Sequence, residues 1–206
     1  MAITNEKLEE IDRLWNSYFF PNTETLRNKL NIYDKEELQK KEAEITFERL
    51  VELYENPIQG NFDEEHWEQI HRYTFGDLYD WAGEYRYVNM QKETGFTDIT
   101  NIEYFLNGEL KLMNAEINNI YSVHALAAFL AEYYAHLMAI HPFREGNGRS
   151  CREFLREFVL EKTKNTDSTL NVSFKKNYIS HKKKQIQQTK NKECFYLCLQ
   201  QKKTIL

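Results

Sequence analysis

The chain has 206 residues, of which 41% are hydrophobic and 29% charged, and its formal net charge is −5. This balance is ordinary for a soluble protein, and the low counts of 7 Gly and 3 Pro argue against a loop-rich or all-β fold. The charge is uneven: residues 1–160 carry a net −13 and residues 161–206 a net +8. An acidic body of this size does not suggest a direct nucleic-acid binder. Three cysteines give neither a disulfide framework nor a metal-ligand set, which fits a reducing cytoplasm: Cys151, Cys194 and Cys198.

The N-terminal quarter is predicted to be helical. Residues 4–18 carry one apolar stripe at helical spacing, and a short helix is expected near residues 25–30. Asp34 occupies the cap position of a longer helix whose apolar residues continue as far as Tyr54. Pro57 ends that segment, because proline cannot continue a helix.

The middle of the chain alternates helices with one extended stretch. Helices are expected over residues 63–75 and 100–117, and the loose alternation over 85–97 around Gly95 indicates one β-hairpin. The helix expected over 122–139 is apolar on nearly all sides, so we predict that it is the buried centre of the domain. No apolar run approaches 18 residues, so no membrane span is expected.

One twelve-residue segment, HPFREGNGRSCR, brings four kinds of chemical group together. His141 is a titratable base, and Glu145 is a hard oxygen ligand suited to Mg²⁺. The turn Gly146–Gly148 can present backbone N–H groups to an anion. Arg149 and Arg152 match phosphate oxygens, and apolar residues at helical spacing place both in the first turn of a helix. A base beside phosphate-binding groups is what transfer of a phosphate-containing group to a hydroxyl needs.

This segment resembles the Fic motif, His-x-Phe-x-Asp/Glu-Gly-Asn-Gly-Arg-x-x-Arg. All its specified positions are matched: His141, Phe143, Glu145, Gly146, Asn147, Gly148, Arg149 and Arg152. Residues 75–86 are similar to the region ahead of the family's flap. The resemblance implies an all-α, mainly helical Fic fold with a short β-hairpin flap over 88–96, which aligns a target segment by strand addition. It divides the chain into an N-terminal helical extension (1–56), a Fic core (57–175) and a basic Lys/Gln-rich tail (176–206).

The chemistry that the resemblance implies is transfer of AMP from ATP to a protein hydroxyl, with release of pyrophosphate. On this basis His141 is the general base and Glu145 holds Mg²⁺. The implied nucleotide- and phosphate-binding positions are Gly146, Asn147, Gly148, Arg149 and Arg152. The implied flap positions for the target are Val88, Asn89, Met90 and Phe96. Gly148 favours adenylylation, since a kinase-like branch of the family has lysine there.

Regulation is also expected from the resemblance. Fic proteins are silenced by a Ser/Thr-x-x-x-Glu-Gly/Asn helix whose glutamate pairs with the second motif arginine, here Arg152. In this chain only Thr189 has a glutamate four residues later, Glu193, and Cys194 stands where Gly or Asn is expected. Similarity to Fic toxins therefore favours a small antitoxin in trans, and makes Glu193 a weaker inhibitory candidate.

Several alternatives stay open at this point. Targets of similar proteins include DNA gyrase with topoisomerase IV, and small GTPases. The same segment could serve another nucleotidyl or phosphoryl transfer, for example with UTP, or an inactive binding module held by a partner. The histidines outside the motif lack the spacing of a zinc helix and are expected to pack between helices: His66, His71, His124 and His136.

Overall fold

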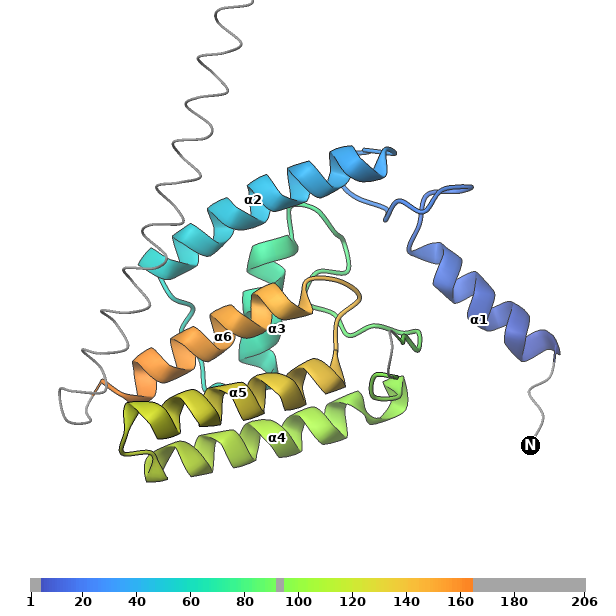
Figure 1. Cartoon of the computed structure of the whole chain (residues 1–206). Coiled ribbons are helices and arrows are strands. Elements are labelled where there is room, and N and C mark those ends of the chain that lie inside the picture. Colours follow the sequence, from blue (N-terminus) through green and yellow to red (C-terminus); the bar gives the residue numbers. More distant parts are fainter. Residues whose placement is uncertain (1–4, 92–94, 165–206) are drawn as a thin grey trace, which may run out of the picture.

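The fold is taken from a computed structural model that describes residues 5–91 and 95–164 (Figure 1). Over these residues the chain is mainly helical, as expected. The elements are α1 (Asn5–Ser17), α2 (Lys35–Glu55), α3 (Glu64–Phe75), η1 (Ile99–Asn101), α4 (Ile102–Glu116), η2 (Ile117–Asn119), α5 (Val123–Ile140) and α6 (Asn147–Lys162). The tail over 176–206, with Thr189 and Glu193, lies outside the described residues.

The helices that carry the motif lie inside a layered helical body. α4, α5 and α6 run as antiparallel neighbours, and α3 crosses behind them (Figure 1). α3 packs against α2, α4 and α6, and α5 packs against both α4 and α6. α1 projects away from this body (Figure 1). Helices on several sides therefore hold α5 and α6, and with them the loop that joins the two.

Capping residues explain where the helices begin. The Asp34 carboxylate accepts a hydrogen bond from the Glu37 N–H at 2.8 Å at the start of α2. The Asp63 carboxylate accepts one from the His66 N–H at 3.0 Å at the start of α3. These bonds satisfy amide groups that have no partner inside the helix, so the two starts follow from local sequence.

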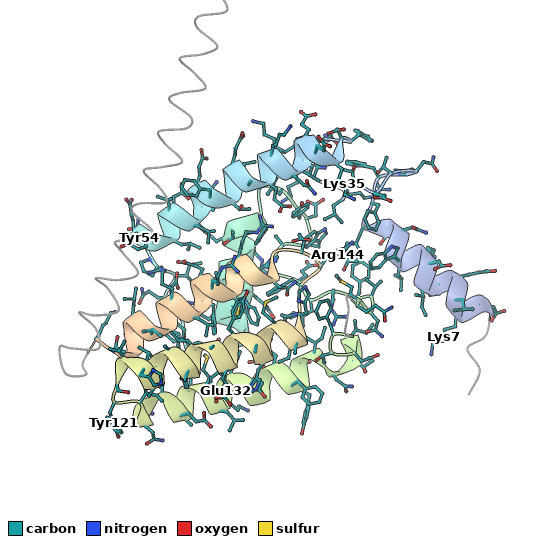
Figure 2. All side chains as sticks on the ribbon, in the orientation of Figure 1. Lys7, Lys35, Tyr54, Tyr121, Glu132 and Arg144 are labelled. Atoms are coloured by element: carbon teal, nitrogen blue, oxygen red, sulfur yellow. The ribbon has the colours of Figure 1, made fainter. Side chains whose placement is uncertain are left out.

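Side chains fill the space between the helices (Figure 2), and aromatic residues of α3, α6 and the motif loop belong to the buried core. Trp67 lies edge-on to Phe143, with ring centroids 5.5 Å apart, and stacks on Phe154 at 5.7 Å. All three side chains are fully buried. Phe143, the aromatic position of the motif, thus anchors the loop in the core.

The prediction of a short helix near residues 25–30 is wrong. An isolated antiparallel bridge pairs Phe19 with Leu26. The Asn28 side-chain amide donates to the Ile32 carbonyl at 2.8 Å, and its oxygen accepts the Ile32 N–H at 3.0 Å. Asparagine bonds of this kind offer the backbone an alternative to helical pairing, and here that alternative forms.

The prediction that the helix over 122–139 is the buried centre of the domain holds for one side of the helix only. α5 buries one stripe of large side chains, Leu126, Phe129, Tyr133, Leu137 and Ile140. Its opposite side exposes mostly alanine, including Ala127, Ala128, Ala131, Ala135 and Ala139. By length and composition alone α5 could cross a membrane. That is weak evidence, because core helices of water-soluble proteins pass the same test and α5 packs against two other helices.

The described residues of the flap segment form no regular strands. A single antiparallel bridge pairs Gln91 with Gly95. The Phe96 N–H donates to the Met90 carbonyl at 3.3 Å. Residues 92–94 lie outside the described part of the chain. The expected β-hairpin over 85–97 is therefore seen only as this bridge.

Candidate active site

The motif loop joins α5 to α6 (Figure 1). Ile140 is the last residue of α5, and His141 follows with left-handed backbone angles of φ 53° and ψ 61°. This conformation is uncommon for a residue other than glycine and costs roughly 1–3 kcal/mol. The neighbouring contacts must therefore hold His141 in place, as is usual at functional sites.

The His141 imidazole is held by a hydrogen bond at one ring nitrogen and by stacking against an aromatic ring. Nδ1 lies 3.3 Å from the Met138 carbonyl oxygen, and the ring stacks on Phe96 with centroids 3.8 Å apart and 7° between the planes. A carbonyl can only accept a hydrogen bond, so this contact requires the proton on Nδ1. In the neutral ring Nε2 is then the nitrogen with the lone pair, which is the form a general base needs.

Two buried side chains form hydrogen bonds to the backbone of the motif loop. The Asn147 amide donates to the Phe143 carbonyl at 2.8 Å, and its oxygen accepts the Phe143 N–H at 2.9 Å. His71 Nε2 donates to the Glu145 carbonyl at 2.9 Å, while Nδ1 accepts the Gly83 N–H. Burial lowers the pKa of His71 to about 4, so its ring stays neutral near pH 7. The Asn147 side chain thus shapes the loop, and only the backbone of this residue can face an anion.

Gly146 is required by the geometry at the start of α6. Its φ is +80°, and a Cβ atom there would lie 2.2 Å from the Phe75 ring. Gly146 also occupies the cap position of α6, where no side chain accepts the first amide hydrogens. The N–H groups of Asn147 and Gly148, at the positive end of the helix dipole, are thus not capped by a side chain and can bind an anion, whereas the Gly146 N–H donates to Glu145 Oε1.

The two motif arginines face different surroundings. Arg149 forms an ion pair with Glu42 on α2, donates to Thr46 Oγ1 at 3.2 Å, and lies 4.7 Å above the Phe75 ring. Arg152 is exposed and donates to the Tyr134 hydroxyl at 3.1 Å.

Gly148 keeps the space beside Arg152 open. A Cβ atom at Gly148 would lie 3.2 Å from Arg152 Nη1. The structure therefore brings Gly148 and Arg152 together and places Arg149 against α2.

Glu145 can offer an oxygen to a metal ion. Its side chain is 45% exposed, and Oε1 accepts the Gly146 N–H at 3.0 Å and lies 3.6 Å from Arg149 Nη2. The described residues contain no group of three or more His, Cys, Asp or Glu that could form a complete metal cage. Mg²⁺ commonly takes one or two carboxylates and completes its shell with substrate phosphates and water, so a single carboxylate fits that ion.

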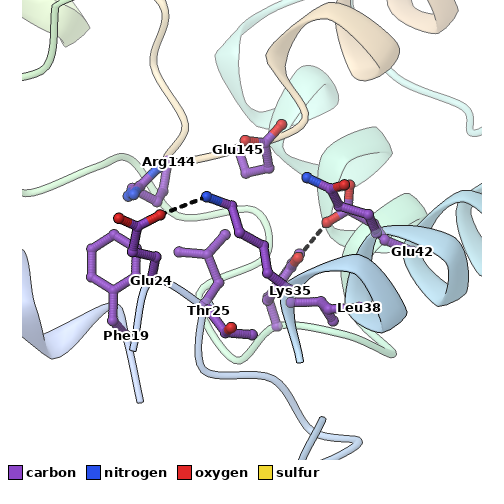
Figure 3. A pocket seen from close by; sticks show the side chains of 11 residues that line it. Phe19, Glu24, Thr25, Lys35, Leu38, Glu42, Arg144 and Glu145 are labelled. Atoms are coloured by element: carbon purple, nitrogen blue, oxygen red, sulfur yellow. Dashed lines mark hydrogen bonds and ion pairs between the residues drawn. The ribbon is translucent and has the colours of Figure 1, made fainter. Parts of the chain in front are cut away.

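A cavity of about 310 Å³ lies on the α2 side of the loop (Figure 3). Glu42, Arg144 and Glu145 contribute to its wall, together with apolar side chains such as Phe19. Arg144 is 9% exposed, and its guanidinium lies 5.2 Å from the Phe19 ring. The Tyr79 hydroxyl donates to Glu42, so Glu42 links the cavity wall to Arg149.

The predicted flap residues divide into one that faces the base and three that shape the segment. Phe96 covers the His141 ring. The Asn89 amide donates to the Asp98 carboxylate at 2.7 Å. Val88 is buried, and Met90 is half-buried and accepts from Phe96 through its carbonyl.

Two side chains at the site were missed from the sequence. Glu42 lies four residues from both Leu38 and Thr46, which are buried on α2, so an acid on the inward face of that helix was a usable signal. Arg86 lies among main-chain carbonyls of the flap and of the motif loop. The loose alternation over residues 85–97 does not single out Arg86, and its partners lie up to 55 residues away.

Comparisons with known proteins identify relatives of this chain. The chain is 36% identical over 152 residues to the protein adenylyltransferase VbhT of Bartonella schoenbuchensis, which covers 70% of this chain and 30% of VbhT. It is 35% identical over 139 residues to the probable protein adenylyltransferase y4lH of Sinorhizobium fredii, covering 66% of this chain and 71% of that protein. The chain thus spans less than a third of VbhT but most of y4lH.

Solved structures and a family model agree. The crystal structure of BepC from Bartonella tribocorum with bound AMPPNP has a TM-score of 0.65 and 26% identity, over 71% of this chain and 78% of BepC. The Fic/DOC family model matches residues 61–159, which include α3, the flap, the motif loop and most of α6. The chain therefore belongs to the Fic/DOC family.

Proposed function

We propose that this chain is a protein adenylyltransferase, which transfers AMP from ATP to a hydroxyl side chain of another protein and releases pyrophosphate. The observation that carries the proposal is the His141 ring, whose Nδ1 contact makes Nε2 the basic nitrogen, in the loop that leads into α6. Relatives named protein adenylyltransferases and the AMPPNP-bound BepC structure support it.

The proposed reaction is an in-line displacement at the α-phosphorus of ATP. His141 Nε2 takes the proton of the target hydroxyl as its oxygen bonds to the α-phosphorus. The bond from the α-phosphorus to the bridging oxygen breaks, and pyrophosphate leaves with the electron pair. Phe96 covers the ring of the base, so the flap and the base meet where the hydroxyl must enter.

The start of α6 supports binding of the phosphates. Uncapped amide groups after Gly146 and the exposed Arg152 guanidinium offer charge and hydrogen bonds to phosphate oxygens. Glu145 would hold Mg²⁺ together with those oxygens. Mg²⁺ bound there would neutralise charge that builds up on the phosphates.

We also propose that the chain is a bacterial, cytoplasmic toxin held in check by an antitoxin in trans. In the described residues no carboxylate lies within ion-pair distance of Arg152, whose side-chain partner there is the Tyr134 hydroxyl. A partner helix with a Ser/Thr-x-x-x-Glu-Gly pattern could supply that carboxylate. DNA gyrase with topoisomerase IV, or a small GTPase, is the target class we would examine first.

The test uses the full chain with Mg²⁺, a bacterial lysate and ATP labelled at the α-phosphate. We expect label on a lysate protein, and loss of about 10²–10⁴-fold in its rate in the His141→Ala variant. His124→Ala is the matched control, because His124 is exposed on the first turn of α5, and it should keep the wild-type rate.

Other labels separate the alternatives. Transfer from γ-labelled ATP would indicate phosphorylation, and transfer from labelled UTP another nucleotidyl transfer. No protein label with any nucleotide, and no binding of Mg·ATP, would indicate a binding module and overturn the proposal.

A further inference from the structure

Arg86 is a buried cation whose partners are all main-chain oxygens. It is 2% exposed, and in the described part of the chain every hydrogen bond of its guanidinium goes to a carbonyl. Burying a charge is unfavourable unless hydrogen bonds compensate for the lost water. Burial also lowers the pKa of Arg86 from its usual value, but an arginine stays protonated near pH 7. A cation in this setting must have its donors closely matched to fixed acceptors.

The carbonyls that Arg86 binds come from both sides of the flap and from the motif loop. Nη1 donates to the Val88 carbonyl at 2.9 Å, before the flap turn, and Nη2 donates to the Thr97 carbonyl, after it. Nε donates to the His141 carbonyl at 2.8 Å, and Nη2 lies 3.4 Å from the Ile140 carbonyl. One rigid group therefore joins both ends of the flap to the residue that carries the base.

Backbone bonds around Arg86 reinforce the same junction. The Arg86 N–H donates to the Pro142 carbonyl at 2.8 Å, and the Thr97 N–H donates to the Ala139 carbonyl at 3.1 Å. The carbonyls at the end of α5 carry the negative end of the helix dipole, which favours a cation there. The guanidinium supplies a planar fork of five N–H donors, which a lysine ammonium cannot reproduce.

We propose that Arg86 is a positioning residue for the adenylyl transfer, which fixes the flap and its Phe96 side chain at a set distance from the His141 imidazole. The inference rests on the proposed function, because the flap matters only if it aligns a target hydroxyl with this base. Arg86 touches no reacting atom. It acts by holding His141 in its left-handed conformation and by setting where the flap begins and ends.

The phosphate-binding part of the loop is held by other contacts. Asn147 pairs with the Phe143 backbone, and Ser150 Oγ accepts from the Trp67 indole at 3.1 Å. Removing the Arg86 guanidinium should therefore weaken turnover of the protein target while leaving nucleotide binding in place. A residue that only stabilised the fold would not separate these two quantities.

The experiment compares Arg86→Gln and Arg86→Lys with Arg156→Gln in the full chain. Arg156 is the matched control: it is also 2% exposed, but it lies on α6 and binds Glu153 and the Leu53 carbonyl. The assay measures label transfer from α-labelled ATP to the main labelled protein of a bacterial lysate, with melting temperature and the Kd of Mg·ATP measured alongside.

We expect both Arg86 variants to lose about 10²-fold in transfer rate per folded molecule, the size of effect that a misplacement near 1 Å can cause. Their Kd for Mg·ATP should stay within about twofold of the wild type, since nucleotide binding rests on separate contacts. Arg156→Gln should lower the melting temperature and keep the transfer rate of the folded fraction. Equal transfer rates in Arg86→Gln and Arg156→Gln would overturn the proposal.

A second readout does not depend on catalysis. Nuclear Overhauser contacts between the Phe96 and His141 rings should be present in the wild type and in Arg156→Gln, and absent in Arg86→Gln. If they persist in Arg86→Gln, Arg86 does not set the distance between flap and base, and the proposal fails. If the wild type labels no protein but these contacts behave as expected, the proposed function fails and the positioning role of Arg86 stands.

Discussion

Arg149 and Arg152 lie one helical turn apart on α6, yet their contacts indicate different roles. Arg149 is bound by Glu42 and Thr46 on α2 and lies over the Phe75 ring. A phosphate would have to compete with Glu42 for the same N–H groups. Arg152 is exposed and bonded to a hydroxyl, so it can turn to a ligand at little cost. We therefore expect Arg149 to tie the motif helix to α2, and Arg152 to bind phosphate.

Replacing Glu42 by glutamine tests the role of Arg149. The Glu42 side chain is 14% exposed and also accepts from the Tyr79 hydroxyl, so the variant removes the shorter of the two ion pairs of Arg149 and leaves Glu145, 3.6 Å away, as its counter-ion. We expect the free energy of unfolding to fall by about 2 kcal/mol, measured by urea denaturation, and the transfer rate to fall with it. Glu44→Gln is the control, because that exposed ion pair with Lys41 should be worth less than about 1 kcal/mol. A faster transfer in Glu42→Gln would instead identify Glu42 as an inhibitory counter-ion.

The start of α6 depends on one residue type at one position. Alanine at Gly146 would need a positive φ and would meet the Phe75 ring, so we expect Gly146→Ala to lower the free energy of unfolding by about 1–3 kcal/mol. It should also weaken Mg·ATP binding, because the helix start moves. Gly108 lies within α4 with no atom within 4 Å of an added Cβ. Gly108→Ala should therefore raise stability by about 0.5–1 kcal/mol. Thermal unfolding of both variants checks the pair, and equal effects would contradict the assigned geometry.

Across the whole molecule, the sequence was informative where a residue acts on its neighbours in the chain. Asp34 and Asp63 each cap a helix by accepting the N–H of the residue three positions later. Both helix starts could therefore be located from local sequence patterns. The functional groups of the motif loop could also be predicted, because its base, carboxylate and arginines lie within twelve residues of the sequence. Composition was less reliable for α5, since alanine counts as apolar but does not require burial.

The parts that could not be predicted depend on contacts between distant segments. Arg149 and Glu42 lie 107 residues apart, and no local pattern relates them. The same holds for Arg86 and the His141 carbonyl, at a separation of 55 residues. The short helix predicted near residues 25–30 does not form for a local reason. The Asn28 side chain forms two hydrogen bonds with the Ile32 backbone, and these replace helical pairing. Tertiary contacts therefore decide which motif arginine is available to a ligand.

The different roles of Arg149 and Arg152 should affect the thermal stability of the whole fold differently when nucleotide binds. A ligand that binds only the folded chain stabilises it by about 2.7 kcal/mol at 100 times its Kd. Mg·ATP at that concentration should raise the melting temperature by roughly 5–10 °C for a chain of this size. EDTA should remove most of this shift, because the role proposed for Glu145 is to hold the nucleotide through Mg²⁺.

The arginine variants separate the two roles in the same measurement. Arg152→Gln should keep the melting temperature of the unliganded protein and lose most of the Mg·ATP shift. Arg149→Gln should lower the unliganded melting temperature, because the link to Glu42 on α2 is lost. Arg13→Gln, on the exposed side of α1, should match the wild type in both. A shift that survives EDTA would contradict the role of Glu145, and equal shifts in wild type and Arg152→Gln would contradict that of Arg152. An unchanged melting temperature in Arg149→Gln would mean that α2 and α6 are held together without this arginine.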